Sequence, residues 1–147
     1  MTTIVYREGY MAGDTRAYRG YDVELGNKQK VFKIHNELVG ISTNIVGLSN
    51  LILNYLSENN QKPLREVIGT SIEIDHLAVL AVNEKGIARF MSHDLLWTEI
   101  TGEYFVVGSG EKYALGALCL GASAREAVEV ASRFDQHTNN IIDVISH

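Results

Sequence analysis

The chain has 147 residues, 46% of them apolar, and its 13 Lys and Arg against 18 Asp and Glu give a formal net charge of −5. This length is typical of one domain spanning residues 1–147, and it suffices for a full hydrophobic core. The acidic balance argues against a nucleic-acid-binding protein, and the lone Cys119 excludes a disulfide framework. No apolar run approaches the roughly 18 residues of a membrane helix, and no signal peptide is recognisable, so we expect a cytoplasmic protein.

The first half of the chain carries strand signals followed by helix signals. Runs rich in β-branched and aromatic residues predict strands at 2–6, 10–14, 31–35 and 38–42. Apolar residues at a helical period predict a helix over 45–56, and Pro63 suits the first position of a shorter helix ending at Ile68. The first half therefore supplies strands and then two helices.

The second half repeats this order. Strands are predicted at 77–82 and 87–91, on either side of a turn, and again at 95–97 and 104–107. Helices are predicted at 110–120 and 123–134, the latter from the capping-box pattern of Ser123 and Glu126, before a last strand at 141–145. Two antiparallel sheets, with one pair of helices on the outer side of each, would bury the apolar faces of these strands and helices. The sequence therefore predicts an α+β fold, a four-layer αββα sandwich.

The start of the chain contains a candidate catalytic residue, Thr2. Met1 precedes the small residue Thr2, which is the context in which aminopeptidases remove a methionine. An N-terminal threonine combines a hydroxyl nucleophile with an α-amine that titrates near a pH of about 8, so it needs no histidine. If Met1 is retained, Thr2 has an amide instead and the base is missing. The alternative reading is an ordinary strand with a polar first residue.

Two charged residues farther along could act on such a hydroxyl. A Lys30 ammonium near it would favour its ionisation, and the Asp14 carboxylate would hold that ammonium in place. A surface ion pair is the alternative. The sequence therefore leaves two interpretations open: Lys30 activates the threonine hydroxyl, or Lys30 and Asp14 form an ion pair at the surface.

A glycine-flanked serine and a polar segment complete the candidates. Ser109 stands between two glycines at a predicted strand-to-helix turn, where glycine permits positive φ and close backbone approach. The segment lacks the further residues of a phosphate-binding loop. Asp135 and Thr138 follow the last predicted helix, where they could hydrogen-bond a distant amine or hydroxyl, or simply end the helix.

Taken together and in this order, these segments resemble the proteasome β-type subunits and HslV-like peptidases of the N-terminal nucleophile hydrolase superfamily. The resemblance covers nearly the whole chain, and the ordered set makes it specific. It rests on Met1-Thr2-Thr3-Ile4-Val5, Gly13-Asp14, the Lys30 strand through Gly40, Val107-Gly108-Ser109-Gly110 and Asp135-x-x-Thr138.

The resemblance implies a threonine-type peptidase without a cofactor or a catalytic metal. Thr2 would attack the peptide carbonyl with its own amine as general base. Lys30 would lower the pKa of the hydroxyl and Asp14 would position Lys30. Ser109, Asp135 and Thr138 would orient the amine and a water molecule.

The resemblance also implies where a substrate lies. The backbone amide near Asn44 would form the oxyanion hole, although the family usually carries glycine there. Ala17, Lys28 and Ser42 match positions that line the first specificity pocket, and Lys28 would favour acidic side chains.

A homo-oligomeric ring that encloses Thr2 follows from the same resemblance, with peptides or unfolded proteins as substrates and an AAA+ unfoldase as partner. Two rival hypotheses stay open: a catalytically silent subunit acting as scaffold or binding module, and a small-molecule amidase of the same superfamily. Cys119, in a run of Ala, Leu and Gly, is predicted to be a buried thiol.

Overall fold

The structure is a computed structural model that describes residues 2–19 and 23–147, and these residues form eleven β-strands and four α-helices. The mixed architecture of antiparallel sheets and helices predicted from the sequence is confirmed. The strands are β1 (Thr3–Arg7), β2 (Tyr10–Asp14), β3 (Arg16–Arg19), β4 (Val23–Asn27), β5 (Val31–Ile34), β6 (Glu37–Thr43), β7 (Leu77–Asn83), β8 (Ala88–Met91), β9 (Trp97–Ile100), β10 (Tyr104–Gly108) and β11 (Ile142–Ser146). The helices are α1 (Leu48–Ser57), α2 (Leu64–Ile68), α3 (Glu111–Cys119) and α4 (Ala124–Phe134).

Within the described residues the strands form two large sheets and one small one. The first large sheet has the order β10-β1-β2-β11 and the second the order β5-β6-β7-β8-β9, with antiparallel pairing throughout. In the first sheet, Thr3 pairs with Gly108 and Asp14 pairs with Ile142. The pairing therefore brings the start of β1, the end of β2 and the start of β11 to the same end of the sheet as Gly108, the last residue of β10.

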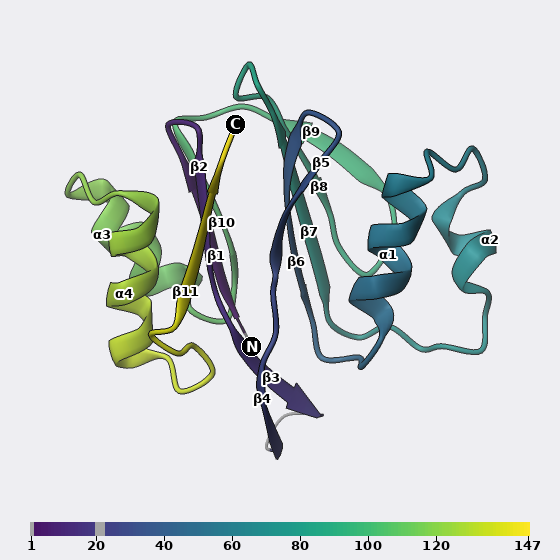
Figure 1. Cartoon of the computed structure of the whole chain (residues 1–147), viewed down its shortest axis with the longest axis horizontal. Helices are drawn as coiled ribbons and strands as arrows, with labels where there is room; N and C mark the ends of the chain where they lie inside the picture. Colours follow the sequence, from purple (N-terminus) through teal and green to yellow (C-terminus); the bar gives the residue numbers. More distant parts are fainter. Residues whose placement is uncertain (1, 20–22) are drawn as a thin grey trace.

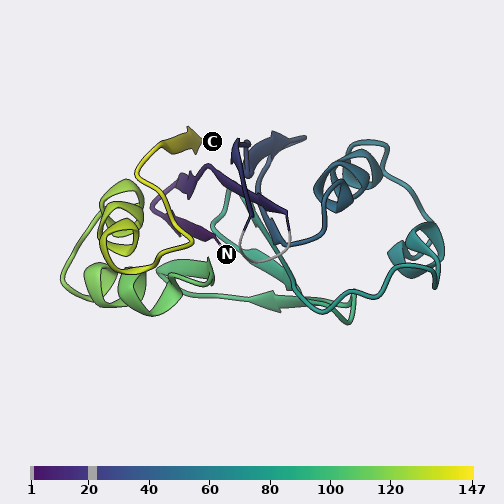
Figure 2. The same cartoon turned by 90° about the horizontal axis from the view of Figure 1, so that it is seen from below.

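The helices cover the outer faces of the two large sheets (Figure 1). Helices α3 and α4 pack on the first sheet through small side chains, such as Ala114 and Ala127 against Val5 and Ala12. Helices α1 and α2 pack on the second sheet, where Ile52 belongs to the same core cluster as Val79. Figure 2 shows the same arrangement from below, with the small sheet of β3 and β4 near the start of β1.

A third core cluster lies between the two sheets. Ile4 and Met11 of the first sheet meet Val31, Leu38 and Leu80 of the second. The facing strands come close at Gly40 of β6, where an added Cβ would lie 2.6 Å from Ile4 Cγ2. This close approach sets the spacing between β1 and the second sheet, and therefore the position of Thr2, the residue before β1.

Three predicted features differ from the structure. Helix α1 begins at Leu48 rather than at residue 45, because Gly47 before it adopts a left-handed φ of 88°. The strand predicted at 95–97 begins at Trp97, since Leu95 has a φ of 63°. Cys119 is exposed rather than buried: Leu118 faces the sheet, and the next residue of a helix points about 100° away from it.

The hairpin of β3 and β4 was not predicted at all. Arg, Gly, Asp, Glu and Asn are interspersed among the apolar residues of 16–27, and every residue of β4 is exposed. Among the described residues, none of the helices has the length and apolar character needed to cross a membrane.

The approach at Gly40 predicts opposite effects for two Gly-to-Ala substitutions. Gly40→Ala should lower the free energy of unfolding by about 1–3 kcal/mol, because its Cβ would overlap Ile4 between the sheets. Gly116→Ala, in α3 with open space around the new Cβ, should instead raise it by about 0.5–1 kcal/mol. Urea denaturation of both variants measures the difference, and a Gly40→Ala protein as stable as wild type would contradict the argument.

Candidate active site

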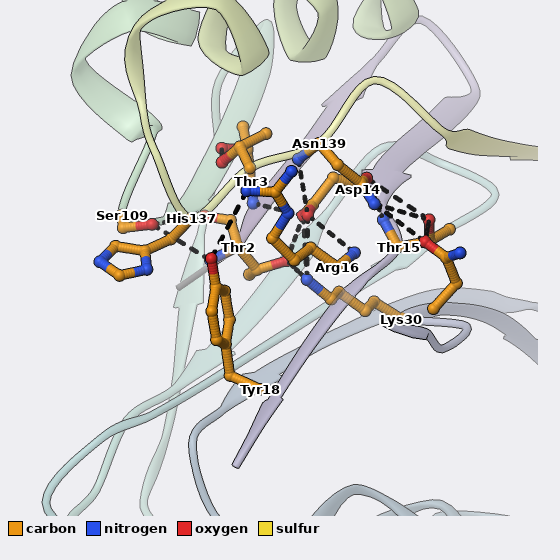
Figure 3. A network of polar contacts seen from close by, with 12 residues as sticks. Thr2, Thr3, Asp14, Thr15, Arg16, Tyr18, Lys30, Ser109, His137 and Asn139 are labelled. Atoms are coloured by element: carbon orange, nitrogen blue, oxygen red, sulfur yellow. Dashed lines mark hydrogen bonds and ion pairs between the residues drawn. The ribbon is translucent and has the colours of Figure 1, made fainter. Parts of the chain in front are cut away.

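Thr2 is buried directly before β1, and its hydroxyl contacts two charged side chains (Figure 3). The Thr2 Oγ1 donates a hydrogen bond to Asp14 Oδ1 and accepts one from Lys30 Nζ at 2.5 Å. Lys30 Nζ also lies 3.1 Å from both carboxylate oxygens of Asp14. Asp14 is 0% and Lys30 2% exposed, so the structure contains a buried ion pair in direct contact with a threonine hydroxyl.

The carboxylate of Asp14 is held by further donors. Its Oδ1 accepts the Thr3 amide at 2.9 Å, and its Oδ2 accepts the Arg16 amide at 3.2 Å and the Asn139 amide at 3.4 Å. A buried carboxylate is costly unless such donors surround it. These bonds come from three separate segments, so the position of the carboxylate is fixed by the fold.

The pKa of the Lys30 ammonium is lower than that of an ordinary lysine. Burial lowers the pKa of Lys30 to about 8, although the neighbouring Asp14 carboxylate acts in the opposite direction. At neutral pH the group is therefore mostly cationic and lies beside the Thr2 hydroxyl. Lys33, the other lysine of this strand region, is exposed.

A second set of polar groups meets the backbone of Thr2. The Thr2 nitrogen donates to Ser109 Oγ at 3.2 Å, and Ser109 Oγ donates to Asp135 Oδ2 at 2.6 Å. Thr138 Oγ1 donates to the same Asp135 oxygen at 2.6 Å and lies 2.7 Å from Thr3 Oγ1. Thr138 thus reaches Thr2 only through its neighbours. Burial alone would raise the pKa of Asp135, but the bonds from Ser109, Thr138 and the His137 amide hold it below its usual value.

The two glycines around Ser109 are required by close packing against β1. Gly108 has a φ of 111°, and a Cβ there would overlap the carbonyl oxygen of Thr2. A Cβ on Gly110 would overlap the Thr3 hydroxyl. Only glycine fits at both positions, and the turn between β10 and α3 therefore delivers the Ser109 hydroxyl to the Thr2 nitrogen.

Some residues of this network were missed by the sequence analysis. Asn139 accepts the Thr15 amide at 3.0 Å and donates to Asn27 Oδ1 at 2.9 Å, so the segment before β11 is bonded to the residue between β2 and β3 and to the end of β4. Its place directly after Thr138 was the only available signal. The Gln136 carbonyl accepts Arg16 Nη1 at 2.6 Å and the Tyr18 hydroxyl at 3.2 Å.

Asn44, the residue after β6, has an unused backbone donor. Among the described residues, its N–H donates to no acceptor, and its buried side-chain Oδ1 has no partner either. Its φ is not positive, and the left-handed residue of this turn is Gly47. A free backbone N–H is the kind of donor that binds a developing oxyanion.

A pocket of about 390 Å³ opens beside Asn44. Of the predicted pocket residues, Ala17 and Lys28 line it, while Ser42 does not and is buried with an unpartnered hydroxyl oxygen. Burial lowers the pKa of Lys28, with Asp14 acting in the opposite direction. Within the described part of the chain, no cluster of three or more His, Cys, Asp and Glu side chains could hold a metal ion.

Comparisons with known proteins show the fold. No protein-family model matches the chain, and no curated protein matches it either. Solved structures do match: Thiobacillus denitrificans BPH in complex with epoxomicin is 17% identical with a TM-score of 0.74, over 99% of this chain and 97% of that one. Eukaryotic HslV from Trypanosoma brucei is 15% identical with a TM-score of 0.68, over 99% of both chains. Anbu, the ancestral β-subunit from Yersinia bercovieri, is 16% identical with a TM-score of 0.73, over 100% of this chain and 81% of that one.

The chain therefore has the HslV-like fold of proteasome β-type subunits, as the sequence resemblance implied. Identities this low show the fold alone.

The hydrogen bonds to Asp135 predict a titration shift. Ser109→Ala removes one donor, so the pKa of Asp135 should rise toward or above its ordinary value, since burial then acts with less opposition. The Asp135 carboxyl ¹³C shift followed against pH by NMR measures this. Ser132→Ala is the matched control, because Ser132 Oγ donates to the Glu129 carbonyl and leaves Asp135 untouched. An unchanged midpoint in Ser109→Ala would contradict the assignment.

Proposed function

We propose that this chain is the subunit of an N-terminal threonine peptidase that hydrolyses peptide bonds through Thr2. The observation that carries the proposal is the contact of the Thr2 hydroxyl with Lys30 and Asp14, while Ser109 holds the Thr2 nitrogen. The candidate nucleophile, the cation beside it and the nitrogen that would act as general base therefore lie together in one buried site. The working form begins at Thr2, because only then is the Thr2 nitrogen a free amine that can accept a proton.

The reaction proceeds through an ester on Thr2. The hydroxyl oxygen bonds to the substrate carbonyl carbon while its proton passes to the α-amine, directly or through one water molecule. The amine then gives this proton to the departing nitrogen of the substrate as the peptide bond breaks. A water molecule, deprotonated by the same amine, attacks the ester and frees the carboxylic acid product, which restores the Thr2 hydroxyl.

The surrounding groups stabilise and orient this chemistry. The Lys30 ammonium favours the ionised hydroxyl, and Asp14 keeps Lys30 within reach of it. The free N–H of Asn44 binds the oxyanion of the tetrahedral intermediate. Ser109 orients the amine and is itself held by Asp135, with Thr138 supporting Asp135.

A homo-oligomeric ring in the cytoplasm is part of the same proposal. Its support is a group of exposed apolar side chains on α3, α4 and the turn between them, Tyr113, Leu115, Leu120 and Phe134. Exposed apolar patches of this kind mark interaction surfaces. The four-layer αββα arrangement belongs to the proposal as well. Enclosed in a ring, Thr2 would meet only unfolded polypeptides, which an AAA+ unfoldase would deliver.

The second candidate is a silent subunit that acts as a scaffold. It is favoured by Asn44, which stands where the family usually carries glycine, and by Met1, which leaves the Thr2 nitrogen in an amide until it is removed. The intact mass of the purified protein separates the two candidates. Loss of Met1 supports the peptidase, and a retained Met1 after authentic expression supports the scaffold.

Covalent labelling tests the nucleophile. A peptide epoxyketone, which reacts with both the amine and the hydroxyl of an N-terminal threonine, should add one inhibitor mass to the protein that begins at Thr2. Thr2→Ala and Lys30→Ala should lower the labelling rate by roughly a hundredfold or more. Thr101→Ala, which changes an exposed threonine outside the site, should label at the wild-type rate. Labelling that survives Thr2→Ala would refute the assignment.

The charge of Lys30 predicts a pH profile. If the ammonium is the required form, kcat/KM should fall above about pH 8, where Lys30 loses its proton. In Lys30→Arg the guanidinium keeps its charge, so this fall should disappear below a pH of about 10 even though the absolute rate is lower. A kcat/KM that rises through pH 8 in the wild type and is lost in Lys30→Arg would show that the neutral amine of Lys30 acts instead.

A further inference from the structure

The segment 135–141 between α4 and β11 has no regular secondary structure, yet it carries two polar residues of the candidate site. Asp135 and Thr138 are both buried. The Asp135 carboxylate accepts the hydroxyl of Ser109, which in turn accepts a hydrogen bond from the Thr2 nitrogen. In a segment without helix or strand pairing, the position of this carboxylate depends on the bonds that tie the segment to its neighbours.

Tyr18 of β3 supplies one of these ties. Its hydroxyl donates to the Gln136 carbonyl at 3.2 Å, and Arg16 Nη1 donates to the same oxygen at 2.6 Å. A carbonyl oxygen has two lone pairs, so two donors fix the direction of the Gln136 peptide group as well as its distance from β3. Because Gln136 directly follows Asp135, fixing this peptide group also limits where the Asp135 side chain can lie.

The ring of Tyr18 makes a second contact with the same segment. It packs edge-on against the ring of His137, with 5.2 Å between the ring centroids and 76° between the ring planes (Figure 3). The His137 amide donates to Asp135 Oδ1 at 3.2 Å. Tyr18 therefore contacts both of the residues that follow Asp135.

These ties lie near the surface rather than in the core. Gln136 is exposed, and Arg16, Tyr18 and His137 are only partly buried. A hydrogen bond that water can replace contributes little to the free energy of unfolding. Such a tie is better suited to fix the direction of a group than to stabilise the fold.

We propose that Tyr18 is a positioning residue, whose hydroxyl holds the Gln136 carbonyl so that Asp135 keeps Ser109 directed at the Thr2 nitrogen. This inference rests on the peptidase function proposed above, since the Thr2 nitrogen is the general base of that reaction. It gives the hairpin of β3 and β4, which carries Tyr18, a part in the reaction.

Tyr18→Phe tests the role of the hydroxyl. It keeps the ring, and with it the contact with His137 and the part of the pocket wall that Tyr18 forms. In the protein that begins at Thr2, kcat for a fluorogenic peptide should fall about threefold to tenfold, the range of one lost hydrogen bond, while KM stays the same.

The titration of Asp135 gives a second reading that needs no activity. The pKa of Asp135 should rise in Tyr18→Phe, because the carboxylate is then held less firmly against the donors that lower it. The carboxyl ¹³C shift followed against pH measures this midpoint. A role confined to the stability of the fold would leave kcat and the midpoint of the folded variant unchanged.

Tyr55→Phe is the matched control. The Tyr55 hydroxyl also donates to a backbone carbonyl, that of Lys62, at 2.7 Å and in an exposed place. This variant should keep the wild-type kcat, KM and Asp135 midpoint. Arg16→Met is the second variant if Tyr18→Phe does not fold: it removes the other donor to the Gln136 carbonyl, keeps the Arg16 amide that binds Asp14, and should shift both readings in the same direction.

The outcomes distinguish this inference from the proposed function. A wild-type kcat in Tyr18→Phe, an unchanged Asp135 midpoint or a loss confined to KM overturns the positioning role, while epoxyketone labelling still supports the peptidase. A folded protein that begins at Thr2 and reacts with neither the epoxyketone nor the peptides overturns the peptidase, and with it the part of Tyr18 in the reaction, even where the midpoint shifts.

Discussion

The buried pair of Asp14 and Lys30 is the constraint around which the rest of the structure is organised. Two opposite charges taken out of water cost several kcal/mol each unless their remaining hydrogen-bonding capacity is met. Here it is met by the Thr2 hydroxyl and by amides at Thr3, Arg16 and Asn139. To supply these hydrogen bonds, the ends of strands from both sheets must lie close together. The glycines at 40, 108 and 110 are what permit backbones to approach that closely.

Much of the fold could be predicted because local signals agree with the final packing. The capping box at Ser123 and Glu126 begins α4, and the turn at 83–86 joins β7 to β8, as expected. The site residues Thr2, Asp14, Lys30, Ser109 and Asp135 were also named from the sequence, and the structure brings them together. These residues could be predicted only as an ordered set, because each segment taken alone has a simpler structural explanation.

The rest could not be predicted because it depends on contacts between distant segments. The strands of the β3 and β4 hairpin are short, and every residue of β4 is exposed, so no apolar face of β4 is buried. The hairpin is tied down by bonds from Arg16 and Tyr18 to the Gln136 carbonyl, more than a hundred residues away. Asn139 likewise acquires its role only when it meets Thr15 and Asn27. Ser42 matches a pocket position in the sequence, yet it is buried and is not among the residues that line the pocket.

The bonds of Asn139 and Thr138 have a consequence for when the site can exist. Asp14 and Thr3 receive partners that lie 125 and 135 positions later in the sequence. A polypeptide still being synthesised has its Thr2 end outside the ribosome long before these partners emerge. The polar network around Thr2 can therefore assemble only after Thr138 and Asn139 have left the ribosome.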